Sequence, residues 1–293
     1  MIHSGVLEYK KSRYLWWSLF LVVVCIVLFV SQRGTQPANG GTWQGYTIGT
    51  LGALIILWLS ILGLRKRMYK SSLGSVAGWT SAHVYLGVAV IIIGTLHSAG
   101  QLGWNIHTLP YVLMIIVVVS GMIGMYYYIS LPQKSLLNRG GKSRDQLFSE
   151  LFELDEKGAE VANNCSVEIS LAATSAISKT TIGGGLMGQL RRSDKSSLLV
   201  LKDGKQQLVS NADQSRILSL VSEQIPNAVS RAEVEPLREL LSIMSRRQAV
   251  VRRIVRDIQF QALLKIWLYF HVPVTVALIV ALLIHIVSTF FYW

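Results

Sequence analysis

Residues 264–292 read LKIWLYFHVPVTVALIVALLIHIVSTFFY, an apolar run with one charged side chain, Lys265, and two histidines, His271 and His285. A helix needs about 20 predominantly apolar residues to cross the hydrocarbon core of a bilayer. Four earlier segments meet the same requirement. The sequence therefore predicts five membrane-spanning helices, at 14–30, 46–64, 79–98, 109–131 and 264–292.

The composition agrees with a membrane protein. The 293 residues are 51% hydrophobic and 15% charged, whereas soluble domains carry about 25% charged residues. A disordered chain is excluded and a soluble enzyme is disfavoured. We expect an all-α integral membrane protein in contact with the lipid bilayer. It would be a five-helix transmembrane bundle (1–131 and 264–293) with a small, mostly helical (α+β) cytoplasmic insertion (132–263) between helices four and five.

Local patterns predict the elements of the insertion. Ser143 and Gln146 have the spacing of a capping box at the start of a helix. The apolar alternation at 167–171 predicts a strand. The dipeptide Asp203-Gly204, between SLLVL and QQLV, predicts the turn of a β-hairpin.

A second capping box, Ser230 with Glu233, predicts the start of a long helix that continues into span five. Its apolar positions are spaced alternately by four and three residues, which favours packing on the first insertion helix, with docking of another subunit as the alternative. Arginines cluster near its membrane end, where anionic lipid headgroups rather than nucleic acid are the expected partner. They are Arg246, Arg247, Arg252, Arg253 and Arg256.

Lysine and arginine are distributed asymmetrically along the chain. They number 28 against 16 acidic residues, a net charge of +12, and all but Arg33 lie outside the two predicted outer loops. Cytoplasmic segments of membrane proteins are enriched in positive charge. The predicted location is therefore a bacterial inner membrane, with the N-terminus and the insertion in the cytoplasm and the C-terminus outside. Span one is expected to be an uncleaved anchor, because its apolar run is longer than that of a signal peptide.

Four of the six histidines lie inside predicted spans. His83 and His97 in span three, and His271 and His285 in span five, are each 14 residues apart. Fourteen residues turn about 40° short of four full helical turns and rise about 21 Å. Each pair therefore shares one helix face, with one histidine toward each side of the membrane. Because both spans run in the same direction, His83 matches His271 in depth and His97 matches His285.

Two imidazoles at one depth on facing helices have the geometry of bis-histidine haem ligation. The sequence therefore predicts two non-covalent b haems, one between His83 and His271 and one between His97 and His285. A zinc or copper site is the alternative, although the spans contain no Asp or Glu to complete it.

Two glycines of span three support the haem prediction. Gly87 and Gly94 lie on the same helix face as the two histidines. A bare backbone there lets a flat macrocycle approach. Close packing of small residues between helices is the alternative explanation.

Polar residues near the histidines are further candidates. His107, in a short loop past span three with Trp104, is a candidate propionate contact, quinol contact or proton acceptor. The inner cations are candidate partners for haem propionates, although positive charge is expected on that side in any case. They are Arg65, Lys66, Arg67, Lys70 and Lys265.

Two other patterns carry no cofactor. Cys25 lies in span one and Cys165 in the insertion, so neither a disulfide nor a covalently attached haem is expected. Gly183, Gly185 and Gly188 match G-x-G-x-x-G without a framing strand and helix. A flexible loop is therefore expected rather than a nucleotide site.

Residues 96–128, LHSAGQLGWNIHTLPYVLMIIVVVSGMIGMYYY, and 264–293, LKIWLYFHVPVTVALIVALLIHIVSTFFYW, resemble bacterial di-haem transmembrane cytochromes b, of the cytochrome b and ferric-reductase-like grouping. The resemblance begins at His83 and covers spans three to five, roughly half of the chain. It implies that the four span histidines are axial ligands. It also implies electron transfer across the membrane, between a quinone pool or periplasmic carrier and partner redox proteins.

The sequence departs from that grouping in its five spans and in the lack of flavin and nicotinamide domains. We therefore expect an electron-transfer subunit with redox partners at one or both faces, more than a self-contained enzyme. Two alternatives stay open. One is a quinol dehydrogenase or quinone reductase with its own quinone site, and the other is a non-redox metal transporter or assembly protein.

Overall fold

The computed structural model describes residues 7–32, 38–68, 74–103, 105–202 and 204–291. The chain divides into two compact units, Met1–Ile129 with Trp267–Trp293, and Ser130–Ile266. Each unit is described separately.

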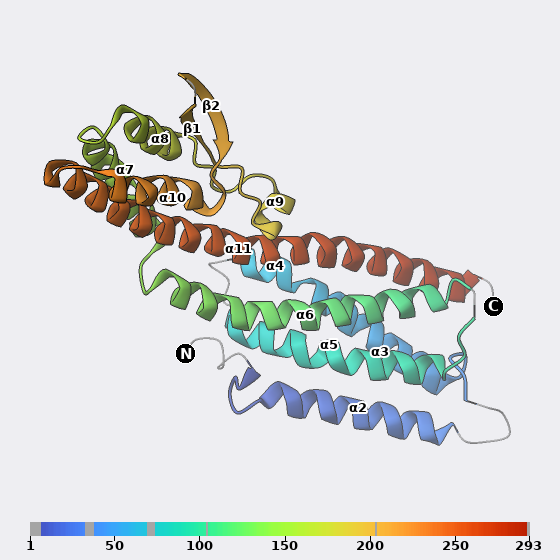
Figure 1. Ribbon diagram of the computed structural model, residues 1–293. Coiled ribbons are helices and arrows are strands. Elements are labelled where there is room, and N and C mark those ends of the chain that lie inside the picture. The colour runs from blue at the N-terminus through green and yellow to red at the C-terminus, as the bar shows by residue number, and fades with distance from the viewer. Residues whose placement is uncertain (1–6, 33–37, 69–73, 104, 203, 292–293) are drawn as a thin grey trace. The chain divides into compact units, whose positions relative to one another are not determined.

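Unit 1 consists of helices (Figure 1). Five helices are long and apolar enough to cross a membrane, which confirms the predicted all-α bundle with five spans, although Tyr292 lies outside the described residues. The helices are α2 (Arg13–Ser31), α3 (Trp43–Ser60), the short α4 (Leu62–Arg67), α5 (Val76–Ser98), α6 (Thr108–Arg139) and α11 (Arg231–Phe291), of which the last two also contribute to unit 2.

Helix α5 is the most buried span of unit 1. Of its most apolar stretch 44% is buried, against 17% for α2, because α5 packs against both α2 and α3. Cys25, Ile48 and Ile93 meet in one apolar cluster between these three helices. A second cluster joins α3, α5, α6 and α11 through Ile56, Val90, Met114, Leu278 and Leu282.

Large apolar side chains cover the outside of unit 1. On α2 alone, Trp16, Trp17, Phe20 and Val27 are each at least 60% exposed. A continuous apolar surface of this kind is costly in water and favourable in hydrocarbon. The bundle is therefore consistent with a surrounding bilayer.

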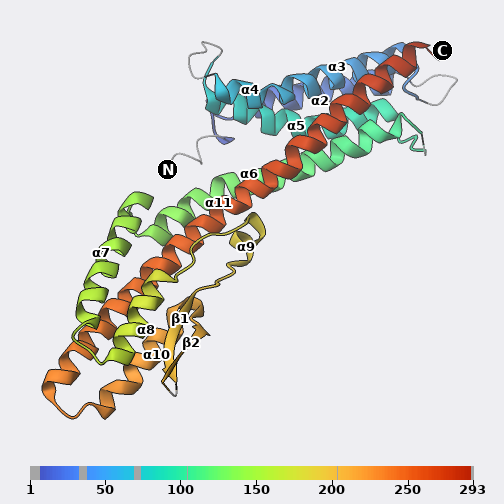
Figure 2. The same cartoon turned by 90° about the horizontal axis from the view of Figure 1, so that it is seen from above.

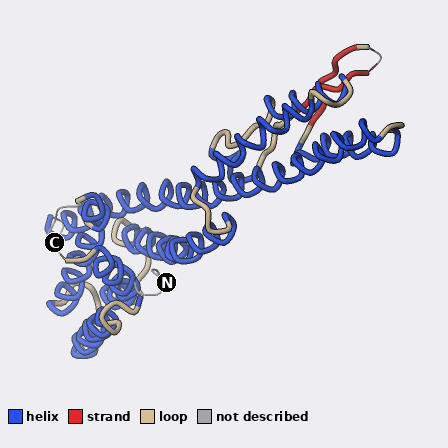
Figure 3. The backbone as a smooth tube through the Cα atoms, turned by 90° about the vertical axis from the view of Figure 1, so that its left-hand side faces the viewer, coloured by secondary structure: helices blue, strands red, loops and turns tan. Residues whose placement is uncertain are grey.

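Unit 2 is mostly helical, with one two-stranded sheet among its described residues (Figures 2 and 3). Strands β1 (Ser197–Lys202) and β2 (Lys205–Ser210) pair antiparallel, as the hairpin pattern predicts. At the turn, Gly204 has a φ of +75°, which glycine adopts without strain, and Asp203 lies outside the described residues. The other elements are α7 (Arg144–Ala162), α8 (Val167–Ser178), α9 (Leu186–Arg191), η1 (Ala212–Gln214), α10 (Ser215–Gln224) and η2 (Ile225–Asn227).

The strand predicted at 167–171 is wrong, because this segment begins helix α8. The side chain of Ser166 accepts a hydrogen bond from the backbone N–H of Ile169 and caps the helix. Buried Ile169, Ala172 and Ala176 continue at helical spacing. The short alternation that suggested a strand covers only the first turn, which the following alanines extend as a helix.

The two capping boxes differ. Ser143 and Gln146 form the predicted reciprocal pair at the start of α7. At the start of α11, the carboxylate of Glu233 instead accepts from the backbone N–H of Val229, at 3.1 Å. The backbone N–H of Glu233 donates a hydrogen bond to the carbonyl oxygen of Ser230 and not to the Ser230 side chain.

Helix α11 packs on α7 as predicted. Leu147, Leu151 and Leu154 of α7 share a buried cluster with Val250, Val251 and Ile254 of α11. Helices α8 and α10 and strand β1 pack against an earlier stretch of α11, around Leu240 and Met244.

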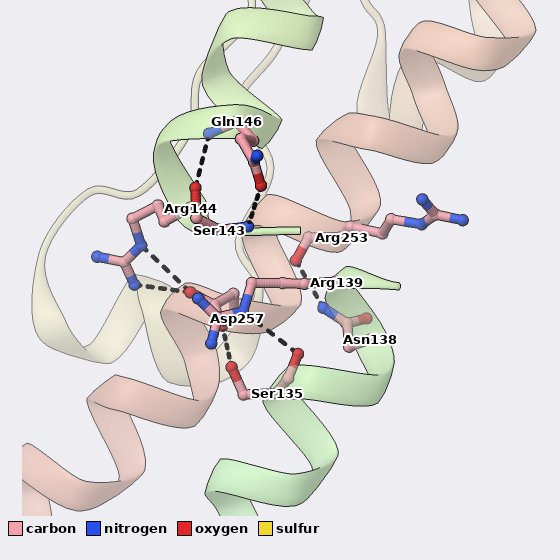
Figure 4. A network of polar contacts seen from close by, with 8 residues as sticks. All are labelled: Ser135, Asn138, Arg139, Ser143, Arg144, Gln146, Arg253 and Asp257. Atoms are coloured by element: carbon pink, nitrogen blue, oxygen red, sulfur yellow. Dashed lines mark hydrogen bonds and ion pairs between the residues drawn. The ribbon is translucent and has the colours of Figure 1, made fainter. Parts of the chain in front are cut away.

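A buried carboxylate joins three segments of unit 2 (Figure 4). Asp257 of α11 is 2% exposed. It accepts a hydrogen bond from Ser135 and two from Arg144, with Arg144 Nη2 at 2.8 Å from Oδ2. Arg139 Nε lies 3.4 Å from the other carboxylate oxygen. The network holds the end of α6 and the start of α7 against α11.

Candidate histidine sites in the membrane helices

The two histidines of α5 are both oriented by backbone carbonyls of α3. His83 Nδ1 lies 3.1 Å from the carbonyl oxygen of Leu59, and His97 Nδ1 lies 2.9 Å from that of Gly45. The two carbonyls are themselves 14 residues apart, so the antiparallel helix repeats the spacing of the histidines. A carbonyl oxygen only accepts hydrogen bonds. Both rings therefore carry their proton on Nδ1.

Helix α6 orients His271 in a similar way. Ser120 Oγ lies 2.8 Å from His271 Nδ1 and also 2.8 Å from the carbonyl oxygen of Val117. The hydroxyl has a single proton, which it donates to the carbonyl, so it accepts from the imidazole. Trp267 stacks on the same ring with centroids 5.3 Å apart.

His285 is oriented by another histidine. Its Nδ1 lies 2.9 Å from Nδ1 of His107, which directly precedes α6, and the two ring centroids are 4.9 Å apart. One of these two nitrogens donates and the other accepts. His107 thus contacts a predicted ligand, a role that its position in the sequence did not suggest.

The four span histidines lie in two groups. At one end of the bundle, the ring centroids of His97 and His285 are 6.1 Å apart, with the ring planes at 88°. At the other end, His83 and His271 interact electrostatically. None of the four Nε2 atoms forms a hydrogen bond with a residue that the structure describes. Each ring therefore keeps one nitrogen able to bind a metal.

The two predicted glycines have different surroundings. A Cβ at Gly87 would meet nothing within 4 Å, so the α5 backbone is open there. A Cβ at Gly94 would lie 2.8 Å from Cε of Met114, so this glycine accommodates a side chain of α6. Close helix packing explains the glycine at position 94. It does not explain Gly87, because no protein atom packs against the backbone there.

Several supporting residues were not identified from the sequence. A Cβ at Gly49 would lie 2.6 Å from Cε1 of His97. Ser120 and the carbonyls of α3 orient rings, as shown above. The glycines at 45, 49 and 52 offered a signal, because they line one face of span two. No sequence signal pointed to the Ser120 contact, because a single serine in an apolar span has no distinguishing pattern.

The predicted cluster of inner cations separates into different roles. Lys66 interacts electrostatically with His83, and its ammonium lies 5.1 Å from the centroid of the Tyr128 ring. Arg65 is buried and donates to the carbonyls of Met68 and Gly74. Arg67 is exposed, Lys265 belongs to unit 2, and Lys70 and Trp104 lie outside the described residues.

The arginine cluster of α11 is also divided. Arg247 is 2% exposed. Its Nε donates to Asp155 Oδ1 at 2.5 Å and its Nη1 to Gln214 Oε1 at 2.8 Å. The expectation that this arginine faces lipid headgroups is therefore wrong. Arg252 is exposed and pairs with Asp213, and this pairing lowers the pKa of that carboxyl.

Among the described residues, no other metal or nucleotide site emerges. Over the described ranges, no group of three or more His, Cys, Asp and Glu side chains is arranged to hold a metal ion. Gly183, Gly185 and Gly188 border a pocket of about 280 Å³ with Lys195. The six-residue helix α9 follows directly, without the preceding strand that a dinucleotide fold requires.

Comparison with known proteins gave no match to a family model, to a curated protein or to a solved structure. The resemblance to di-haem cytochromes b therefore stays a prediction from the sequence.

Proposed function

We propose that this protein is a di-haem b-type cytochrome subunit that transfers electrons across a bacterial inner membrane. One observation carries the proposal. Four histidines lie at two depths of an apolar bundle, and each has its Nδ1 engaged and its Nε2 without a described hydrogen-bond partner. Histidines that bind metals almost always donate their other ring N–H to a carbonyl or comparable acceptor.

The distances at one site agree with bis-histidine ligation. Two metal–nitrogen bonds of about 2 Å each, with about 1 Å from each nitrogen to its ring centre, separate two ring centroids by about 6 Å. The centroids of His97 and His285 are 6.1 Å apart. His97 and His285 would hold one haem, and His83 and His271 would hold the other.

When bound, haem would supply an iron that accepts and releases one electron, and the imidazoles of the four span histidines would hold it. The protein residues hold the rings, exclude water and set the local charge. Lys66 is the cation best placed to bind propionate groups near His83, because Arg65 is engaged by two backbone carbonyls.

The asymmetry of Lys and Arg supports the orientation. The segments proposed to be cytoplasmic hold 26 of the 28 such residues, and Lys265 lies at the cytoplasmic end of span five. The sites of His83 and His271 would then lie toward the cytoplasm, and those of His97 and His285 toward the periplasm. Redox partner proteins at one or both faces would supply and remove the electrons. Reporter fusions to each terminus in a bacterial host test this orientation, which is overturned if the N-terminus is outside.

A dithionite-reduced minus oxidised absorption spectrum of the purified full-length chain, with haem quantification, tests the function. We expect two b haems per chain with low-spin spectra. His97→Ala and His271→Ala should each lose about one haem, whereas His3→Ala, the same change outside the spans, should keep both. A haem-free protein from haem-replete cells overturns the proposal, as does full haem retention in both span variants.

A further inference from the structure

The hydrogen bond between His107 and His285 differs from those of the other three span histidines. Leu59, Gly45 and Ser120 present oxygens that accept from the imidazole, so the ring protonation follows from the partner. The partner of His285 is an imidazole nitrogen, which donates or accepts according to its own protonation. The state of His285 therefore depends on which of the two rings holds the shared proton.

Exposure decides between the two arrangements. In a neutral imidazole, the nitrogen that does not accept carries a proton that needs a partner. If His107 donates from Nδ1, the proton of His285 moves to Nε2, where it has no acceptor among the described residues, and this ring is only partly exposed. If His285 donates, the second proton lies on Nε2 of His107, a residue whose side chain is exposed. The second arrangement satisfies both rings.

We propose that His107 is a positioning residue, which accepts the Nδ1 proton of His285 and so presents Nε2 of His285 as a ligand. This inference rests on the proposed haem function. It assigns to His107 the role that a carbonyl or a serine hydroxyl has at the other three rings. His107 acts through His285 and does not itself bind the iron.

The loop before α6 is built to hold His107 in place. The side-chain oxygen of Asn105 accepts from the backbone N–H of His107 at 3.1 Å. It also accepts from the backbone N–H and from the hydroxyl of Thr108, at 3.0 and 3.1 Å. These three bonds cap the first turn of α6 and fix the backbone from which the imidazole reaches His285.

The test compares His107→Leu with His107→Gln in the full-length holoprotein. Leucine removes the acceptor, whereas the glutamine side chain retains an oxygen that accepts. The redox and EPR signal of the haem proposed at His97 and His285 is first assigned as the signal that is lost in His97→Ala. Redox titration, low-temperature EPR and haem retention are then measured for that haem, with His3→Leu as the matched control.

We expect His107→Leu to weaken haem binding at this site by about 10–100-fold, the usual effect of losing a partner of a metal ligand. Its midpoint potential should rise, because a histidine that no longer donates a proton to an acceptor is a poorer electron donor to iron. The signal of the haem proposed at His83 and His271 should not change. His107→Gln should restore the affinity and most of the potential.

Three results overturn the inference while leaving the proposed function intact. One is a His107→Leu protein with wild-type affinity and potential. Another is equal damage in the leucine and glutamine variants. The third is loss of the low-spin signal in both His107 variants with its retention in His285→Ala, which would make His107 the ligand. A wild-type chain without haem would instead refute the proposed function itself.

Discussion

The ring of His97 occupies the space that a side chain at residue 49 would fill. A Cβ built on Gly49 lies 2.6 Å from Cε1 and 2.7 Å from Nδ1 of His97. One helical turn earlier, the carbonyl of Gly45 accepts from the same ring. Helix α3 thus both makes room for His97 and orients it.

Gly49→Ala is therefore expected to displace the His97 ring. Overpacking of this kind costs about 1–3 kcal/mol, and one of the two proposed haems should be lost or should change its spectrum. Gly63→Ala is the matched control, because a Cβ at that helical position meets nothing within 4 Å. Haem quantification of both variants is the measurement. Equal haem content would show that the ring adjusts without leaving its site.

Gly87→Ala separates haem contact from helix packing. A Cβ there meets no protein atom, so the haem-free chain should fold at least as well, given the higher helix propensity of alanine. If a macrocycle lies against this face, the variant should bind less haem at the site of His83 and His271. Unchanged haem content together with unchanged thermal stability would show that Gly87 does not contact a haem.

Lys66→Met should lower the midpoint potential of the haem proposed at His83 and His271. A nearby positive charge favours the reduced, less positive iron, and its removal is expected to shift the potential by about 30–60 mV. Arg67→Met, in the adjacent exposed position, controls for general loss of charge. Redox titration in detergent measures the midpoint potentials of both variants. A larger shift in the Arg67 variant would contradict the assignment of Lys66.

Asp257→Asn should destabilise unit 2. The buried carboxylate interacts with Arg139 and Arg144, which are 26% and 36% exposed in their side chains. Removing the charge is expected to cost about 1–3 kcal/mol. Asp213→Asn breaks an ion pair whose side chains are both more than half exposed, so it should cost less than about 1 kcal/mol. Thermal unfolding and limited proteolysis near residue 140 measure the difference, and equal effects would argue against a structural role for the network.

Alkylation of Cys165 should be slow at neutral pH. Burial raises the pKa of this thiol above its usual value of 9.0, and the thiolate is the reactive form. Any stability that the neutral thiol contributes is complete below pH 9 and is lost as the pH rises through the raised pKa. The labelling rate in a Cys25→Ser background, measured from pH 7 to 10, should keep increasing beyond pH 9 in the folded protein. A plateau below that pH would contradict the shift.

Local patterns in the sequence were sufficient for the five spans, the hairpin and the α7 capping box. Long apolar runs, a two-residue Asp-Gly turn and a Ser–Gln spacing each act over a few neighbouring residues. The segment at 167–171 failed because five alternating residues fit a strand and one turn of helix equally well. The Ser166 cap, the alanines that follow and the packing against the rest of unit 2 selected the helix.

The sequence by itself determined that four histidines lie in apolar spans, 14 residues apart in pairs and at matching depths, because helical rise and rotation depend on spacing alone. Tertiary structure decided what each ring contacts. The carbonyls of Leu59 and Gly45, the hydroxyl of Ser120 and the ring of His107 all reach their partners from 24 or more residues away. No periodicity encodes such pairings, because they arise only when antiparallel helices pack side by side and place one backbone or side chain against another.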